Sequence, residues 1–121
     1  MNQREMLRLL AYSRDKSTVP ENIFKYTNYN EEEDCFITPD PTSIKSYKIV
    51  AVTLTSAGKL PNNGVRNHFT HVFIDEAGHA VESEALGCMA LTTKQSLKNP
   101  PVTVLAGGKT YSTTYVIAYV I

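Results

Sequence analysis

Short apolar runs separated by polar stretches divide the chain into expected strands and turns. Three such runs, at residues 47–54, 69–74 and 102–106, are short and rich in β-branched or aromatic side chains, which predicts strands. The first run is almost continuously apolar, as in a parallel strand that is covered on both faces. Beyond the second run, apolar residues recur at helical spacing at Val81, Ala85, Cys88 and Met89. This alternation favours an α/β fold.

The polar segments predict turns and loops. Pro20 follows a turn and is expected at the first position of a helix. Residues 28–42 carry four successive acids and then Pro39 and Pro41, so a solvated loop is expected there, with an acidic metal-binding cluster as the alternative. Residues 61–64 are expected to form another loop.

Two adjacent carboxylates, Asp75 and Glu76, end the second apolar run. Ligands of open α/β sheets bind outside the carboxyl ends of the strands, which is where this pair would lie. Phosphate hydrolysis needs one acid to hold Mg²⁺ and another to orient or deprotonate water. Asp75 suits the first role and Glu76 the second. The alternative is a buried strand that simply ends in two solvated acids.

The turn expected at residues 55–59 combines hydroxyls, exposed amides and the cation of Lys59, groups that can contact a phosphate backbone. The alternative is an ordinary strand-to-helix turn that is capped by Thr55 or Ser56. The three histidines, His68, His71 and His79, lack the spacing of a zinc site, and structural or solvated imidazoles are expected instead.

Composition narrows the class of protein. The chain has 121 residues, enough for one domain or part of one, and its 12 basic residues balance 12 acidic ones. This balance gives no overall electrostatic signature of nucleic-acid binding. No segment has the length of a membrane span, and the amino terminus makes a poor signal peptide. Cys35 and Cys88 are expected to be reduced thiols, and the expected location is cytoplasmic.

Three stretches resemble a known family. The segment VFIDEAGHAVESEAL, at residues 72–86, is similar to motif II of superfamily 1 helicases in its DEAG form, and more narrowly to the Armitage / Moloney-leukaemia-virus-10-like RNA helicases. Residues 8–23 and 47–60 are similar to segments between motif Ia and motif II of that family, in the same order. The resemblance covers residues 7–107 and implies an incomplete RecA-like, P-loop NTPase-type parallel sheet with flanking helices. It also places a strand near residues 7–11, where residue types alone favour a helix.

The resemblance also implies functions for particular residues. Asp75 would hold Mg²⁺ of bound ATP, Glu76 would activate water, and His79 would link the nucleotide site to the nucleic-acid side. Thr53, Ser56 and Lys59 match a segment that contacts RNA in the family, although Val52 stands where a second threonine is usual. The implied function is ATP-dependent RNA unwinding or translocation, in the context of RNA silencing.

The similarity stops after Gly107, where motif III would continue. The stretch VTVLAGGKT is not a phosphate-binding loop, because Thr103 stands where its first glycine should be. Residues 1–60 contain no such loop either, and motif Ia, the second helicase domain and its arginine fingers are also missing. We therefore expect residues 1–107 to be an internal slice of the first helicase domain, from a truncated gene model, a splice product or a remnant. The alternative function is an inactive remnant that acts at most as an interaction protein.

Residues 108–121 are expected to be an unrelated, β-prone tail. Positions 111–121 contain no charge, proline or glycine, which is typical of an aggregation-prone strand. With no further chain to cover it, this strand is expected to be exposed, to lower the solubility of the protein and to allow self-association.

Overall fold

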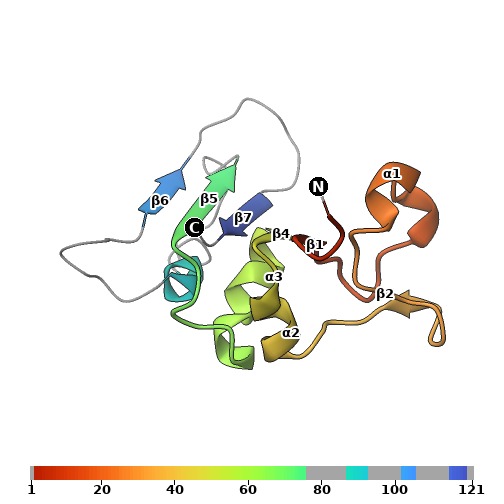
Figure 1. Cartoon of the computed structure of the whole chain (residues 1–121), viewed down its shortest axis with the longest axis horizontal. Coiled ribbons are helices and arrows are strands. Elements are labelled where there is room, and N and C mark those ends of the chain that lie inside the picture. Colours follow the sequence, from red (N-terminus) through yellow and green to blue (C-terminus); the bar gives the residue numbers. More distant parts are fainter. Residues whose placement is uncertain (1, 76–86, 93–101, 106–114, 120–121) are drawn as a thin grey trace.

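The protein is an α/β structure built on a mixed sheet, seen in a computed structural model that describes residues 2–75, 87–92, 102–105 and 115–119 (Figure 1). Helices among these residues are short. The elements, in chain order, are β1 (Met6–Arg8), η1 (Lys16–Thr18), α1 (Glu21–Phe24), β2 (Tyr29–Asn30), β3 (Cys35–Phe36), α2 (Pro41–Ser46), β4 (Ile49–Thr53), α3 (Leu54–Lys59), η2 (Pro61–Asn63), β5 (His71–Asp75), η4 (Cys88–Leu91), β6 (Val102–Leu105) and β7 (Tyr115–Tyr119).

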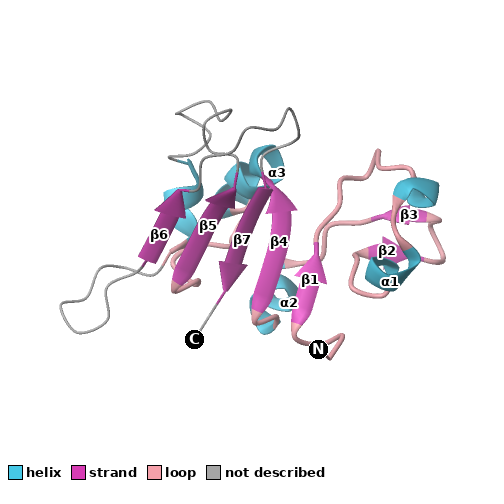
Figure 2. Cartoon of the chain, turned by 90° about the horizontal axis from the view of Figure 1, so that it is seen from above, coloured by secondary structure: helices cyan, strands magenta, loops and turns pink. Residues whose placement is uncertain are grey.

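Five strands form the main sheet, in the order β1-β4-β7-β5-β6 (Figure 2). The pairs β1–β4 and β5–β6 are parallel, and β7 is antiparallel to both β4 and β5. The strands predicted from the three apolar runs are confirmed, as is the amino-terminal strand, in β1. The expectation of a wholly parallel sheet is wrong, because β7 separates the two parallel pairs.

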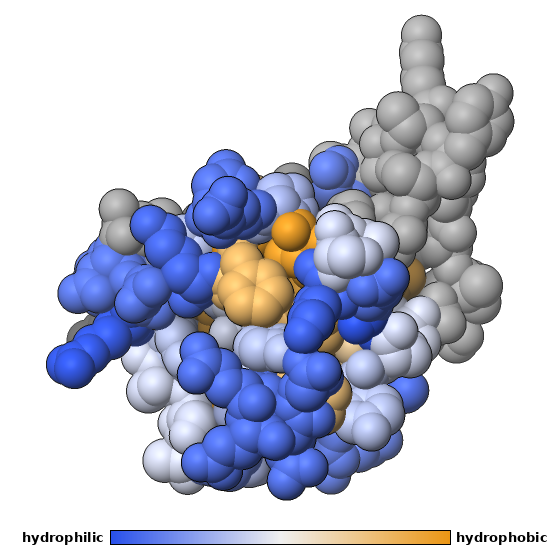
Figure 3. Space-filling model, turned by 90° about the vertical axis from the view of Figure 1, so that its right-hand side faces the viewer, coloured by the Kyte–Doolittle hydropathy of each residue, from blue (hydrophilic) through white to orange (hydrophobic). Residues whose placement is uncertain are grey.

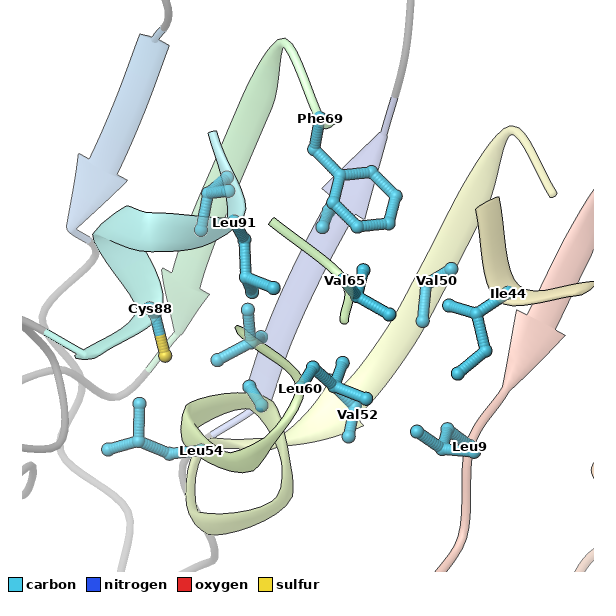
Figure 4. Close-up of a cluster of buried hydrophobic side chains, with 14 of the residues drawn as sticks. Leu9, Ile44, Val50, Val52, Leu54, Leu60, Val65, Phe69, Cys88 and Leu91 are labelled. Carbon is cyan, nitrogen blue, oxygen red and sulfur yellow. The ribbon is translucent and has the colours of Figure 1, made fainter. Parts of the chain in front are cut away.

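One face of this sheet carries the hydrophobic core. Val50 and Val52 of β4 point to this face together with Val72 of β5, and all three are buried. Side chains from α2, α3 and η4 cover them, as Figure 4 shows for Ile44, Leu54 and Leu91. Along β4 buried residues alternate with half-buried ones, so of the two faces expected to be covered, one is fully buried and the other is covered in part.

The carboxyl-terminal strand is the most important correction. Residues predicted to form an exposed tail instead place β7 in the middle of the sheet, paired along its whole length with β4 and with β5. Val116 and Ala118 are buried in the core, although Ile117 on the opposite face is 41% exposed. A strand without charges or prolines suits an interior position because neighbouring strands satisfy its backbone on both sides. Self-association through residues 108–121 stays a prediction.

A smaller unit lies beside the β1 edge and contains α1 and the antiparallel pair β2–β3 (Figure 1). The pair β2–β3 lies in the first part of residues 28–42, where a solvated loop was predicted. Phe24, Tyr29 and Phe36 pack their rings together, with centroids 4.9 to 6.3 Å apart. Outside this aromatic cluster, Lys16 forms an ion pair with Asp34. Hydrophilic residues surround a small apolar area on this side of the molecule (Figure 3).

Helix starts differ from the sequence predictions by one to three residues. Pro20 is the N-cap of α1 rather than its first residue. Helix α3 begins at Leu54 with Thr53 as the N-cap, and neither Thr55 nor Ser56 caps it. The unpredicted helix α2 is capped by the side chain of Asp40, which accepts a hydrogen bond from the Ser43 backbone N–H. The helix predicted around Val81 lies largely outside the described residues.

Asn28 joins the smaller unit to the main sheet, and it is the buried polar residue of the described chain. Its side-chain oxygen accepts a hydrogen bond from the Leu10 N–H at 2.7 Å. Its amide group donates to the carbonyl oxygens of Leu10 and Ile37, both at 3.0 Å. These bonds fix the segment that leaves β1.

Replacing Asn28 by alanine should therefore lower the free energy of unfolding by about 2 to 4 kcal/mol, because the buried N–H and C=O of Leu10 and the part-buried C=O of Ile37 lose these partners. Urea denaturation followed by circular dichroism measures the change. Asn62→Ala is the control, since Asn62 is exposed, and it should have little effect. Equal stability of the two variants would contradict the assigned role of Asn28.

Both cysteines are free thiols, as expected: Cys35 lies on β3 and Cys88 is buried in η4. Within the described part of the chain, no helix has both the length and the apolar character needed to cross a membrane.

Candidate functional site

The carboxyl ends of four strands meet at one edge of the sheet. Strands β1, β4, β5 and β6 all run in the same direction, and β7 runs in the opposite direction between β4 and β5. Thr53, the last residue of β4, and Asp75, the last residue of β5, are both paired with Tyr115. Thr53 and Asp75 thus lie in one row on the same face of the sheet, two strand spacings or roughly 10 Å apart.

Asp75 is the member of the predicted acid pair that the structure describes. It follows the buried Ile74 and is itself exposed at the end of β5, so its carboxylate is accessible at this edge. Glu76 and His79 lie outside the described residues. No cluster of three or more potential metal ligands occurs among the described residues. A single accessible carboxylate is the pattern that suits Mg²⁺ carried by a nucleotide, since this ion keeps several waters and takes other oxygens from phosphates.

Of the three residues assigned to RNA contact by resemblance, Thr53 and Ser56 lie at the start of α3 and Lys59 lies at its end. The Thr53 hydroxyl donates a hydrogen bond to the Ser56 hydroxyl oxygen at 3.2 Å. Lys59, at the last position of α3, is exposed, and Thr53 and Ser56 are half-buried. The structure therefore brings Thr53 and Ser56 into contact at the end of β4, at the edge that carries Asp75, while Lys59 shares a hollow with Ser56 only.

Two hollows lie beside these residues, and both are lined in part by the segment that leaves β1. The larger one, of about 430 Å³, is lined by Thr53 together with Arg8 and Arg14. The smaller one, of about 180 Å³, is lined by Ser56, Lys59 and Tyr12. Leu10 and Ala11, in that segment, line both hollows.

Charges in the larger hollow are mixed. Asp15 contributes a carboxylate, and hydrogen bonds from the backbone N–H and the hydroxyl of Ser17 hold the pKa of Asp15 below its ordinary value. Asp15 therefore stays ionised opposite Arg8 and Arg14. The smaller hollow has a simpler composition, because Lys59 is its charged residue and the other polar groups are hydroxyls and the amide of Asn63.

Sequence reasoning did not predict Arg8, Tyr12 and Arg14 as site residues. They stand about 40 residues before α3 in the sequence, and no motif spacing connects them to it. They could have been found by assuming that β1 pairs with β4 in parallel, because the carboxyl ends of both strands then lie at the same edge of the sheet.

The described histidines play no part in this site. His68 precedes β5, and burial lowers its pKa, an effect partly offset by a hydrogen bond with the Lys45 backbone. The imidazole of His68 is therefore neutral at pH 7. His71 lies at the start of β5, at the opposite end of the strand from Asp75.

Comparison with known proteins identifies relatives for most of the chain. It is 38% identical over 100 residues to "Putative helicase MOV-10" of Gallus gallus, which covers 80% of this chain and 10% of the relative. It is 51% identical over 82 residues to "RNA helicase Mov10l1" of Homo sapiens, covering 67% of this chain and 6% of the relative. A third relative, "Putative helicase mov-10-B.2" of Danio rerio, is 42% identical over 87 residues, or 71% of this chain and 8% of the relative.

The chain thus spans a tenth or less of the length of these relatives. No family model matches it. No solved structure matches it either. The relatives that do match are named helicases, and each is similar to two thirds or more of the chain. This result agrees with the resemblance to superfamily 1 helicases that the sequence segments indicated. Over most of its length, the chain is related to one short segment of the MOV-10-like superfamily 1 helicases.

Proposed function

We propose that residues 7–107 form part of the first RecA-like domain of an RNA helicase, in which ATP hydrolysis drives unwinding of or movement along RNA. The observation that carries this proposal is the common edge, where β4 and β5 both end, with Thr53 and Asp75 in one row. An edge of this kind is where α/β proteins bind nucleotides. The similarity to "RNA helicase Mov10l1" supports RNA as the nucleic acid.

In this proposal Asp75 holds the Mg²⁺ of an ATP complex, and its accessible carboxylate at the end of β5 fits that role. The ion would neutralise charge on the phosphates during transfer of the terminal phosphoryl group. Glu76 accepts a proton from the attacking water, and His79 couples the nucleotide site to RNA. A context in RNA silencing and a cytoplasmic location are part of the same proposal.

The RNA side of the proposal rests on α3 and its N-cap. The hydroxyls of Thr53 and Ser56 and the cation of Lys59 supply groups that typically contact the sugar-phosphate backbone. Such contacts position RNA without reading its sequence.

The experiment is a segment exchange in the chicken relative. Its matching segment is replaced by residues 7–107 of this chain, and RNA-stimulated ATP hydrolysis is measured. We expect hydrolysis to persist. A well-folded exchange protein that binds ATP and RNA but has no RNA-stimulated hydrolysis would contradict the proposal.

One observation favours the second candidate function, an inactive remnant that acts as an interaction protein. Strand β7 lies between β4 and β5 and separates Thr53 from Asp75 by one strand. With β7 between them, Thr53 on the proposed RNA side and Asp75 of the acid pair are not direct neighbours. Retained RNA binding without hydrolysis in the exchange protein would support this function.

The 121-residue chain alone should show no ATP hydrolysis above background. Its sequence contains no G-x-x-x-x-G-K-[ST] loop, whose backbone amides and lysine hold the phosphates. Positioning supplies most of phosphoryl-transfer catalysis, so the acid pair alone is insufficient. A phosphate-release assay on the purified chain checks this. Turnover that Glu76→Gln abolishes would show the prediction to be wrong.

A further inference from the structure

Tyr12 is an exposed aromatic residue beside Ser56 and Lys59, two of the residues proposed to contact RNA. Its side chain is 76% exposed, compared with 41% for Ile117 and 39% for Ile37, the other large apolar side chains that the described chain exposes. A single exposed ring is common on protein surfaces and needs no explanation by itself. Tyr12 differs because it lines a hollow together with Ser56 and Lys59.

The backbone on both sides of Tyr12 is held in place. Before it, Leu10 exchanges hydrogen bonds with the buried side chain of Asn28, at 2.7 and 3.0 Å. After it, the Arg14 N–H donates to the Ala11 carbonyl at 2.9 Å and closes a turn that contains Tyr12. The backbone that carries the ring is thus held in place, so a ligand that stacks on the ring does not have to order it.

The smaller hollow has the size and chemistry for part of a polymer. Its volume of about 180 Å³ is below the roughly 300 to 1,000 Å³ of typical small-molecule sites. It offers one aromatic ring, one cation at Lys59, and the hydroxyls of Ser56 and Thr38. An aromatic ring beside a cation is the combination by which proteins hold single-stranded nucleic acids, with bases stacked on rings and phosphates near cations.

We propose that Tyr12 is a base-stacking platform for single-stranded RNA, with the neighbouring phosphate at Lys59. The RNA strand then passes over Leu10 and Ala11, which line both hollows. Arg14, in the larger hollow, lies near the next part of the RNA backbone. Asp15 in the larger hollow repels phosphate, so the base-stacking end of the path is the smaller hollow. This inference rests on the proposed RNA function and adds the residue that contacts a base.

The test uses the full 121-residue chain and a short fluorescein-labelled single-stranded RNA, with binding measured by anisotropy between about 50 and 200 mM salt. Tyr12→Ala should weaken binding about fivefold or more, because one base loses its stacking partner. Tyr12→Phe should bind as the unchanged chain does, since the ring is kept. Neither variant should alter the salt dependence.

Lys59→Gln should act differently, because Lys59 contacts phosphate. It should reduce the slope of log K against log salt by about 0.7, the value for one phosphate of a single strand. Lys25→Gln is the control: Lys25 is exposed but lies over the Tyr26 ring, outside both hollows, and its replacement should change little. An RNA with 2-aminopurine in place of one base should show quenching by the unchanged chain and less by Tyr12→Ala.

The outcomes separate this inference from the proposed function. If Lys59→Gln lowers the salt slope while Tyr12→Ala binds normally, the stacking role is wrong and RNA binding by α3 stands. Loss of binding in both Tyr12→Ala and Tyr12→Phe also overturns stacking, because the ring remains in the second variant. If the unchanged chain does not bind RNA, the inference fails, and the segment exchange then decides the proposed function independently. Circular dichroism melts check that Tyr12→Ala is folded, as expected for an exposed position.

Discussion

Val116→Asp should prevent stable folding, so that no cooperative unfolding transition is seen. Ile117→Asp should still unfold cooperatively. Val116 is 0% exposed on the core face of β7, and Ile117 is 41% exposed on the other face. The first change loses about 1.5 to 3 kcal/mol of apolar burial, and it puts a carboxylate where desolvation costs several kcal/mol more. Small domains are stable by only about 5 to 15 kcal/mol, so this loss removes most of the stability.

Thermal melts followed by circular dichroism compare the two variants, which introduce the same charge at adjacent positions. Removal of residues 108–121 should have the same effect as Val116→Asp, because β4 and β5 would lose their shared partner strand. This expectation reverses the one from sequence, by which the shorter chain should be more soluble. A shorter chain that melts cooperatively, or equal melts for the two aspartate variants, would show that β7 is not part of the folded sheet.

The strands were predictable from the sequence because their signals are local. Each of β4, β5 and β6 overlaps an apolar run bounded by polar residues, and burial of such runs drives sheet formation whatever their order. The start of α3 was less predictable. A capping side chain was expected at Thr55 or Ser56, but the helix begins without one, so hydroxyls in the turn were not a reliable guide to its first residue.

The position of β7 was not predictable in the same way. Its residues, dense in Val, Ile, Thr and Tyr, suit an exposed aggregating strand and an interior strand equally well. What decides between them is which partner strands are available, and that is a property of the whole fold. An apolar segment at the end of a chain therefore indicates a strand, but not the strand's place in a sheet.

The candidate site was predictable only in part, for a related reason. Asp75 ends a predicted strand, so the rule that ligands bind at the carboxyl ends of strands indicated this edge of the sheet. Lys59 was chosen instead from the chemistry of its turn and from the family resemblance. Tyr12 and Arg14 lie beyond β1, whose pairing with β4 alone places them beside α3. Residues in a loop after a strand that is distant in sequence have no motif or spacing that connects them to the site. The roles assigned to Asp75, Thr53, Ser56 and Lys59 stay predictions, as do those of Glu76 and His79, which lie outside the described residues.

Glu76→Gln in the exchange protein should reduce kcat for RNA-stimulated ATP hydrolysis by about 10²- to 10⁴-fold, the usual contribution of a general base. The amide keeps the shape of the carboxylate but cannot accept the proton of the attacking water. Affinity for ATP should be little changed, because Asp75 remains available for Mg²⁺.

Phosphate release under single-turnover conditions measures the chemical step, and a fluorescent ATP analogue measures affinity. Glu21→Gln is the matched control, since Glu21 is an exposed acid on α1, in the smaller unit beside the β1 edge. Its replacement should leave both quantities unchanged. If Asp75 holds the ion as proposed, Asp75→Asn should instead raise the concentration of Mg²⁺ that is required, because the carboxylate ligand is removed. An unchanged kcat in Glu76→Gln would mean that another group activates water, and that the adjacent acids do not divide the two roles between them.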